Sequence, residues 1–155
     1  MLETDEISFQ AFSAPLIGLP VTHVWRGYGS AIFLEFGDLR MRKRLDGSPG
    51  NPKGKMGLMI EWSWRIEGKR RIWCGSWSDE DRWDRYLQKL LHATVLEVKL
   101  FGRLPEINIA FSNGIHLLSM MTAEGDPEWA LFDRRTDITK SVGVKAGRLH
   151  FESGH

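Results

Sequence analysis

The two halves of the chain carry the same order of apolar and polar positions. In each half a Val-x-x-Val block precedes an Ile-x-apolar-x-Phe block. The blocks begin at Val21 and Ile32, and again at Val95 and Ile107. The Val blocks are offset by 74 positions (95 minus 21) and the Ile blocks by 75 (107 minus 32). A pattern that recurs at a nearly constant spacing indicates an internal repeat, so we predict two related β-units.

Strand-like alternation of apolar and polar positions fills most of both units. In the clearest case, residues 58–66, every second side chain from Leu58 to Ile66 is apolar. Trp62 and Trp64 share that face, and we expect both in the core. The predicted strands are 19–25, 31–36, 58–66, 71–77, 95–101, 106–111, 115–121 and 129–132. The polar C-terminal tail has room for one more strand.

One amphipathic helix is predicted between the units, at residues 79–92. Acidic residues fill its first turn, where they interact favourably with the positive end of the helix dipole. Trp83, Leu87 and Leu90 lie on one apolar stripe. Such a stripe has to be buried against a sheet. We therefore predict a single domain over 1–155 of class α+β, an antiparallel β-sheet fold in the order ββββ-α-ββββ, with the number of sheets left open. The two pseudo-repeated units span about 18–77 and 94–151.

Two further segments are predicted to lie outside this pattern. Residues 46–57 contain four glycines and two prolines, which interrupt strand ladders, so they are expected to form the clearest and most mobile loop. Residues 1–17 are interpreted as a lead-in segment. The helix at 79–92 is the only one expected.

Composition and charge fit an ordinary globular protein. Of 155 residues, 42% are hydrophobic and 26% are charged, and 21 Lys and Arg against 20 Asp and Glu give a net charge of +1. Proteins that wrap nucleic acid usually have a large basic excess, so the balance argues against that partner. The N-terminus is acidic where a secretory signal is basic, and no apolar run approaches the roughly 18 residues of a membrane helix. We expect a cytoplasmic protein without a membrane segment.

No residue pattern predicts catalysis, a metal site or a cofactor. The five histidines lack metal-binding spacing, and nucleotide-binding glycine loops and nucleophile elbows are absent. Cys74 is the single cysteine, which excludes an internal disulfide. Its position in the middle of a predicted strand favours a buried, unreactive thiol. We therefore predict that the protein is not an enzyme.

Aromatic and basic residues alternate on the predicted hairpin at residues 65–77. Arg70, Arg71, Trp73 and Trp77 are our candidates for partner binding, since tryptophan and arginine anchor many interfaces. Trp73 and Trp77 share one face of the return strand, which is either exposed or buried. The alternative is that this hairpin binds nucleic acid or a small ligand.

A second group of basic residues flanks the predicted loop. It consists of Arg40, Arg42, Lys43, Arg44, Lys53 and Lys55. One interpretation is a positive lobe that meets phosphates or an acidic partner protein. The other, which we favour, is charge on solvated turns and strand edges, where Lys and Arg discourage edge-to-edge aggregation.

The repeated unit is built around Ile-x-Ile-x-Phe-x-x-Gly, seen at residues 107–114, and is completed by Glu128-Trp129. Over about residues 18–132 this resembles a loose group of small uncharacterised bacterial proteins, some of which resemble immunity proteins of polymorphic or contact-dependent toxin systems. The resemblance implies a non-enzymatic protein that occludes a protein partner, a toxin. A second copy of the chain could complete an exposed edge strand, so we expect a monomer or a homodimer. The near-neutral charge departs from immunity proteins that neutralise nucleases, which are often acidic.

Overall fold

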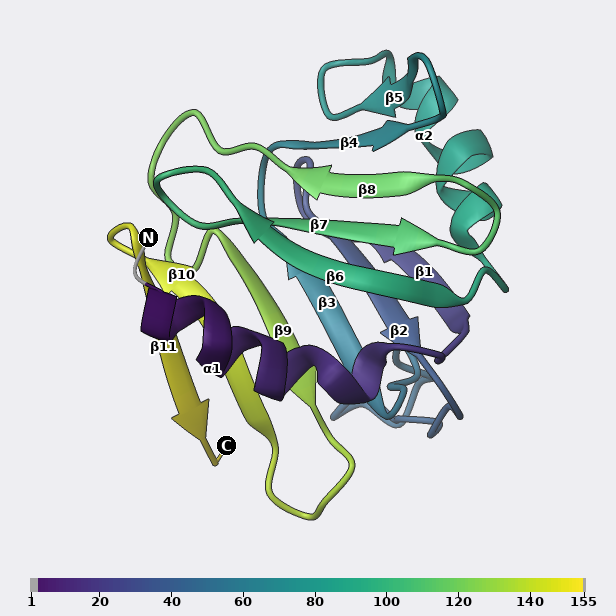
Figure 1. The fold of residues 1–155 in the computed structure, drawn as a ribbon. Coiled ribbons are helices and arrows are strands. Elements are labelled where there is room, and N and C mark those ends of the chain that lie inside the picture. Colours follow the sequence, from purple (N-terminus) through teal and green to yellow (C-terminus); the bar gives the residue numbers. More distant parts are fainter. Residues whose placement is uncertain (1–2, 155) are drawn as a thin grey trace.

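The computed structural model describes residues 3–154, which form two antiparallel sheets and two short helices (Figure 1). The six-stranded sheet consists, in spatial order, of β1 (Val21–Arg26), β2 (Ile32–Phe36), β3 (Met56–Ile60), β9 (Trp129–Asp133), β10 (Lys140–Lys145) and β11 (Arg148–Ser153). The five-stranded sheet consists of β5 (Ile72–Gly75), β4 (Trp64–Glu67), β8 (His116–Ser119), β7 (Glu106–Phe111) and β6 (Val95–Phe101). The predicted α+β class is confirmed, with two sheets rather than one.

Each half of the chain contributes strands to both sheets. After β3 the chain crosses at residues 61–63 into the five-stranded sheet, where β4 pairs with β8. After β8 it crosses back at residues 120–128, and β9 pairs with β3. The single strand predicted for 58–66 is therefore wrong. Because its residues divide between two sheets, Trp64 is 1% exposed in the core while Trp62, at the crossing, is 41% exposed.

The predicted helix between the halves is present but shorter. Helix α2 (Glu80–Leu87) lies within the predicted range 79–92 and continues as a 3₁₀ turn to Leu90. Trp83, Leu87 and Leu90 are buried, as the stripe predicts. The Trp83 ring packs edge-on against Trp64, with ring centroids 5.3 Å apart. Helix α2 packs against β5, the edge strand of the five-stranded sheet.

The predicted lead-in contains a second helix, α1 (Glu3–Ser13), while residues 1 and 2 lie outside the described residues. Only Phe9 and Ser13 of this helix are buried, so its sequence shows no apolar stripe. Phe9 packs edge-on against Trp129 at 5.8 Å between ring centroids. In Figure 1 the helix lies across β3 and β9, on the inner face of the six-stranded sheet.

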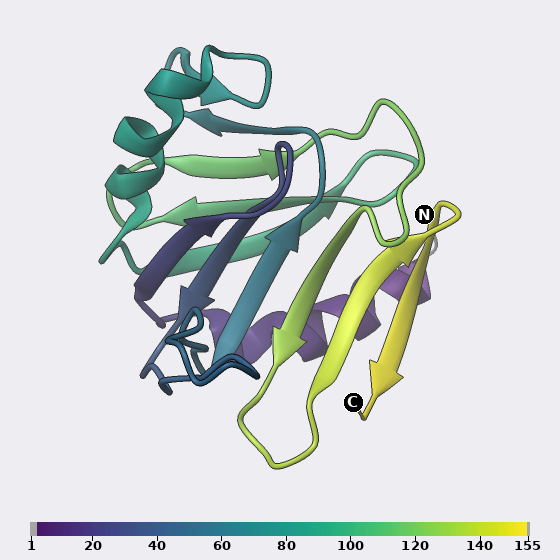
Figure 2. The same ribbon diagram turned by 180° about the vertical axis from the view of Figure 1, so that it is seen from behind.

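The number of strands differs from the predicted order ββββ-α-ββββ. Five strands precede α2 and six follow it, and the C-terminal tail contributes β10 and β11 rather than one strand. The buried apolar residues of both sheets and both helices form one cluster. In Figure 2 the six-stranded sheet stands in front of α1, so its outer face carries neither of the two described helices.

Two carboxylates lie where β7 approaches the β8–β9 connection: Glu106 is half-buried and Glu128 is buried. Glu106 accepts hydrogen bonds from the Ser119 hydroxyl at 2.9 Å and from the Met121 amide at 2.6 Å. Glu128 is 7% exposed. Burial raises the pKa of both carboxyls, and the negative charge of Glu106 raises the pKa of Glu128 further.

We expect Glu128→Gln to raise the free energy of unfolding at pH 7. A carboxyl whose folded-state pKa lies above its unfolded value destabilises the fold while ionised, and this penalty is relieved as the pH falls through the folded-state pKa. The glutamine variant lacks the penalty at every pH. Urea unfolding of both proteins at pH 7 and at pH 5 measures this, and the gap between them should narrow at pH 5. An equal gap at both values would contradict the assignment.

Candidate functional site

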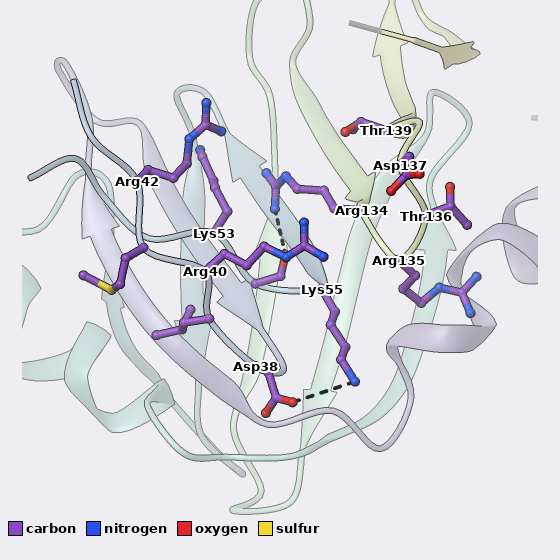
Figure 3. A pocket seen from close by; sticks show the side chains of 13 residues that line it. Asp38, Arg40, Arg42, Lys53, Lys55, Arg134, Arg135, Thr136, Asp137 and Thr139 are labelled. Carbon is purple, nitrogen blue, oxygen red and sulfur yellow. Dashed lines mark hydrogen bonds and ion pairs between the residues drawn. The ribbon is translucent and has the colours of Figure 1, made fainter. Parts of the chain in front are cut away.

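A basic cleft lies beside the six-stranded sheet, where the β2–β3 connection (residues 37–55) meets the β9–β10 loop (residues 134–139). Its volume is about 720 Å³. Six cationic side chains line it, together with two acidic ones, Asp38 and Asp137. The cations are Arg40, Arg42, Lys53, Lys55, Arg134 and Arg135 (Figure 3). We call this site the basic cleft.

One wall of the basic cleft is a folded-back arm, residues 38–55. Arg40 and Lys53 exchange two backbone hydrogen bonds, of 2.7 and 3.0 Å, and the Gly50 amide donates to the Arg42 carbonyl at 2.8 Å. As predicted, residues 46–55 form none of the strands, but Met56 and Gly57, the end of the predicted loop, belong to β3. The predicted mobility stays a prediction, but backbone hydrogen bonds join the two sides of the arm.

A buried ion pair fixes the base of the arm to the sheet. Glu35 on β2 is 1% exposed, and its Oε1 accepts hydrogen bonds from the Gly54 amide at 2.9 Å and from Arg134 Nη1 at 2.8 Å. A Cβ atom at Gly57 would lie 2.7 Å from Arg134 Nη1 and would displace the guanidinium from its position beside Glu35. At Gly54 a Cβ would collide with the Phe36 carbonyl oxygen. The arm, β2 and the β9–β10 loop are thus joined at one carboxylate.

Three cations of the basic cleft lie close enough to repel one another. Burial lowers the pKa of Lys53, and the positive charges of Arg134 and Arg42 lower it further, whereas Glu35 opposes the shift. In Figure 3 Arg42 and Lys53 extend from the arm and Arg134 approaches them from the end of β9. Holding like charges together is unfavourable unless an anion lies among them.

Half of the six cations have no acidic partner. Lys55 pairs with Asp38 at 4.0 Å and Arg135 with Asp133 at 2.9 Å, and Arg134 pairs with Glu35. Within residues 3–154, no carboxylate lies at ion-pair distance from the three remaining cations. These are Arg40, Arg42 and Lys53. The cleft therefore has positive charge available for an anionic ligand.

The structure divides the predicted hairpin candidates between different surfaces. Arg70 and Arg71 are exposed in the β4–β5 turn. Trp77 is 91% exposed after the end of β5. Trp73 instead packs beside Tyr86 of α2, with ring centroids 6.1 Å apart.

The predicted common face for Trp73 and Trp77 is therefore wrong. Pairing between β4 and β5 shifts from Ile66–Cys74 to Glu67–Ile72, so Trp73 is the extra residue of a bulge. A bulge redirects a side chain without leaving a clear pattern in the sequence.

An apolar groove of about 360 Å³ lies where β5 ends. Trp77 and Ile72, which is 55% exposed, line it together with Met120. Of the four predicted binding residues, Trp77 is the one that lines this groove. The groove and the basic cleft are separate surfaces, with no lining residue in common.

Four of the six cleft cations are found by sequence reasoning, which favours solvated charge over a binding role for them and misses Arg134 and Arg135. They follow β9 directly, and the only local signal is a basic pair at the start of a polar loop. Arg134 meets Glu35 across 99 positions of the chain. Nothing in the local pattern indicates that the two basic segments converge.

Comparisons with known proteins give no relative: no protein-family model, curated protein or solved structure matches this chain. No group of three His, Cys, Asp or Glu within residues 3–154 is arranged to hold a metal ion. Neither α1 nor α2 has the length and apolar character needed to cross a bilayer. The cleft offers positive charge, and the groove offers apolar contact.

Proposed function

We propose that this protein is a non-enzymatic protein-binding domain of the immunity-like kind, which neutralises a toxin by covering it. The exposed Trp77 carries the proposal. A ring left 91% exposed beside an apolar groove is ready to be buried by a partner. Tryptophan is enriched among the residues that dominate binding energy. Arg70 and Arg71 do not line the groove, but they are exposed just before β5, where a partner that extends beyond the groove can reach them.

Occlusion requires a surface of ordinary interface size rather than a catalytic group. Stable complexes bury roughly 1,600 Å² in total. The outer face of the β4–β5 hairpin presents Trp77, Ile72 and Arg65 next to one another around the groove. A partner that buries this face gains apolar contact at its centre and leaves the arginines partly hydrated.

The experiment is co-purification with the protein encoded immediately upstream in the host genome, followed by calorimetry. We expect Trp77→Ala to weaken binding by at least tenfold, because a central tryptophan contributes about 2 kcal/mol or more. Its free energy of unfolding should change by less than about 0.5 kcal/mol, as for other exposed sites. Trp62→Ala is the matched control, since Trp62 is 41% exposed and does not line the groove.

Two results would contradict the proposal. One is a Trp77→Ala variant that binds the partner as tightly as the parent protein. The other is the absence of any stable protein partner in the host. For the alternative, a nucleic-acid site on the 65–77 hairpin, we expect binding that weakens steeply with salt because phosphate contacts release counterions.

We also infer that the fold consists of two related units, near residues 18–77 and 94–151. Matching strand registers support this. In the first unit Val21 pairs with Phe36 and a bulge follows; in the second, Val95 pairs with Phe111 and a bulge follows at the same place. The crossings also match, since Ile60 pairs with Trp129 and Ser119 with Trp64. The two indole Nε1 atoms donate to the carbonyls of Ser30 and Pro105.

The two units differ most in the connection that follows their second strand. Residues 112–115 join β7 to β8 in a short turn, whereas residues 37–55 join β2 to β3. The basic arm is therefore an addition to the first unit. Functional residues are often found in loops added to a rigid scaffold, so this difference supports a role for the arm in binding.

A further inference from the structure

We propose that the basic cleft binds an acidic, extended segment of a protein through its aspartate and glutamate carboxylates. This site goes beyond the proposed contact at Trp77, because the two surfaces share no lining residue. The cations come from two connections, the 38–55 arm and the 134–139 loop, which form facing walls (Figure 3). Charges spread along a cleft of about 720 Å³ suit several carboxylates in a row better than one small anion.

The basic cleft contains cations whose charge no carboxylate within residues 3–154 balances. The cleft lining contains six cations and two acids, and Arg40, Arg42 and Lys53 have no ion-pair partner among residues 3–154. Charge-assisted hydrogen bonds from Arg and Lys to carboxylates are among the stronger polar contacts in proteins. An acidic segment would also relieve the repulsion that contributes to lowering the pKa of Lys53.

The backbone that carries the cations is ordered before any ligand arrives. Arg134 is fixed by Glu35 and is only 19% exposed, and the arm is closed by backbone hydrogen bonds between Arg40 and Lys53. A site that is ordered beforehand loses less conformational entropy on binding. Thr139 on the facing loop adds a hydroxyl donor, whereas the Thr136 hydroxyl already donates to the Ile138 carbonyl at 3.0 Å.

The cleft suits carboxylates better than nucleic acid, because it offers few free aromatic rings. Single-stranded nucleic acid usually stacks its bases on aromatic rings. The rings near this cleft already have contacts: Trp25 stacks on Phe33 at 3.9 Å and carries Lys53 Nζ at 5.7 Å. The Phe132 ring lies under the Arg134 guanidinium, at 5.2 Å.

The test is fluorescence anisotropy on the full-length protein with three fluorescein-labelled probes. These are a peptide of alternating Glu and Ser, the same peptide with Gln in place of Glu, and a single-stranded DNA of equal charge. We expect the Glu peptide to bind and the Gln peptide not to bind. Arg42→Ala should weaken the binding of the Glu peptide about tenfold, the value of one charge-assisted contact.

Arg44→Ala is the matched control, because Arg44 lies on the same arm and carries the same charge but does not line the cleft. We expect it to bind the Glu peptide within about twofold of the parent protein, the shift left by a distant, screened charge. Equal losses in Arg42→Ala and Arg44→Ala would show a diffuse charge effect and overturn the site. So would tighter binding of the DNA than of the Glu peptide, or no binding of either.

The Trp77→Ala variant separates this inference from the proposed function. It should bind the Glu peptide normally, since the groove and the cleft are independent. If the parent protein does not bind the Glu peptide but Trp77→Ala still weakens partner binding, the cleft inference alone fails. If the Glu peptide binds but Trp77→Ala leaves partner binding unchanged, the proposed function alone fails.

Discussion

Replacing Glu35 with alanine is expected to lower the free energy of unfolding by about 3 kcal/mol, the lower end of the range for breaking a buried ion pair. The carboxylate is 1% exposed and accepts hydrogen bonds from the Gly54 amide and from Arg134. Its removal leaves a donor without a partner and a guanidinium without its counter-charge. Because Arg134 is 19% exposed, water relieves part of that cost.

Urea unfolding of three variants checks this prediction. Glu97→Ala removes a carboxylate that is 51% exposed in a surface pair with Lys99, and it should change the free energy by less than about 0.5 kcal/mol. Glu35→Gln keeps an oxygen acceptor but not the charge, so its effect should fall between the other two. If Glu35→Ala unfolds at the same urea concentration as Glu97→Ala, the pair does not fix the arm to the sheet.

The Glu35–Arg134 pair shows where prediction from sequence stops. Glu35 occupies a polar position in an alternating strand, which by its pattern faces solvent. Its burial depends on an arm that folds back over it and on an arginine from a distant loop. Neither the arm nor Arg134 has a local signature in the sequence. The sequence therefore shows the basic residues at 40–44 but not that they share a cleft with Arg134.

Local periodicity predicts elements well where each stays within one sheet. The ranges Val95–Phe101 and Glu106–Phe111 are confirmed exactly as β6 and β7, and the stripe of α2 is buried as expected. The period of two along 58–66 is equally regular, yet the chain turns there. A crossing between sheets depends on which strands pair, and pairing is a property of the whole fold. Helix α1 is not predicted because it buries too few side chains to produce an apolar stripe in the sequence.

Trp64→Ala is the second substitution with a large expected effect, a loss of about 4 kcal/mol in the free energy of unfolding. The indole is 1% exposed, packs edge-on against Trp83, and donates from Nε1 to the Ser30 carbonyl at 2.8 Å. Alanine leaves a cavity and an unpaired acceptor where α2 meets the five-stranded sheet. Total stabilities of about 5–15 kcal/mol make partial unfolding at 37 °C a realistic outcome.

Trp64→Phe keeps the variant measurable, because it retains most of the ring volume and removes the donor. We expect it to cost about 2 kcal/mol, between a large-to-small substitution and a lost hydrogen bond. Trp62→Ala, two positions away, is the internal control and should cost clearly less than Trp64→Ala, because its side chain is already 41% exposed. The period of two assigns both tryptophans to one buried face, whereas the crossing at 61–63 places only Trp64 in the core. Similar losses at the two positions in urea unfolding would mean that 58–66 is one strand and that the chain does not pass between the sheets there.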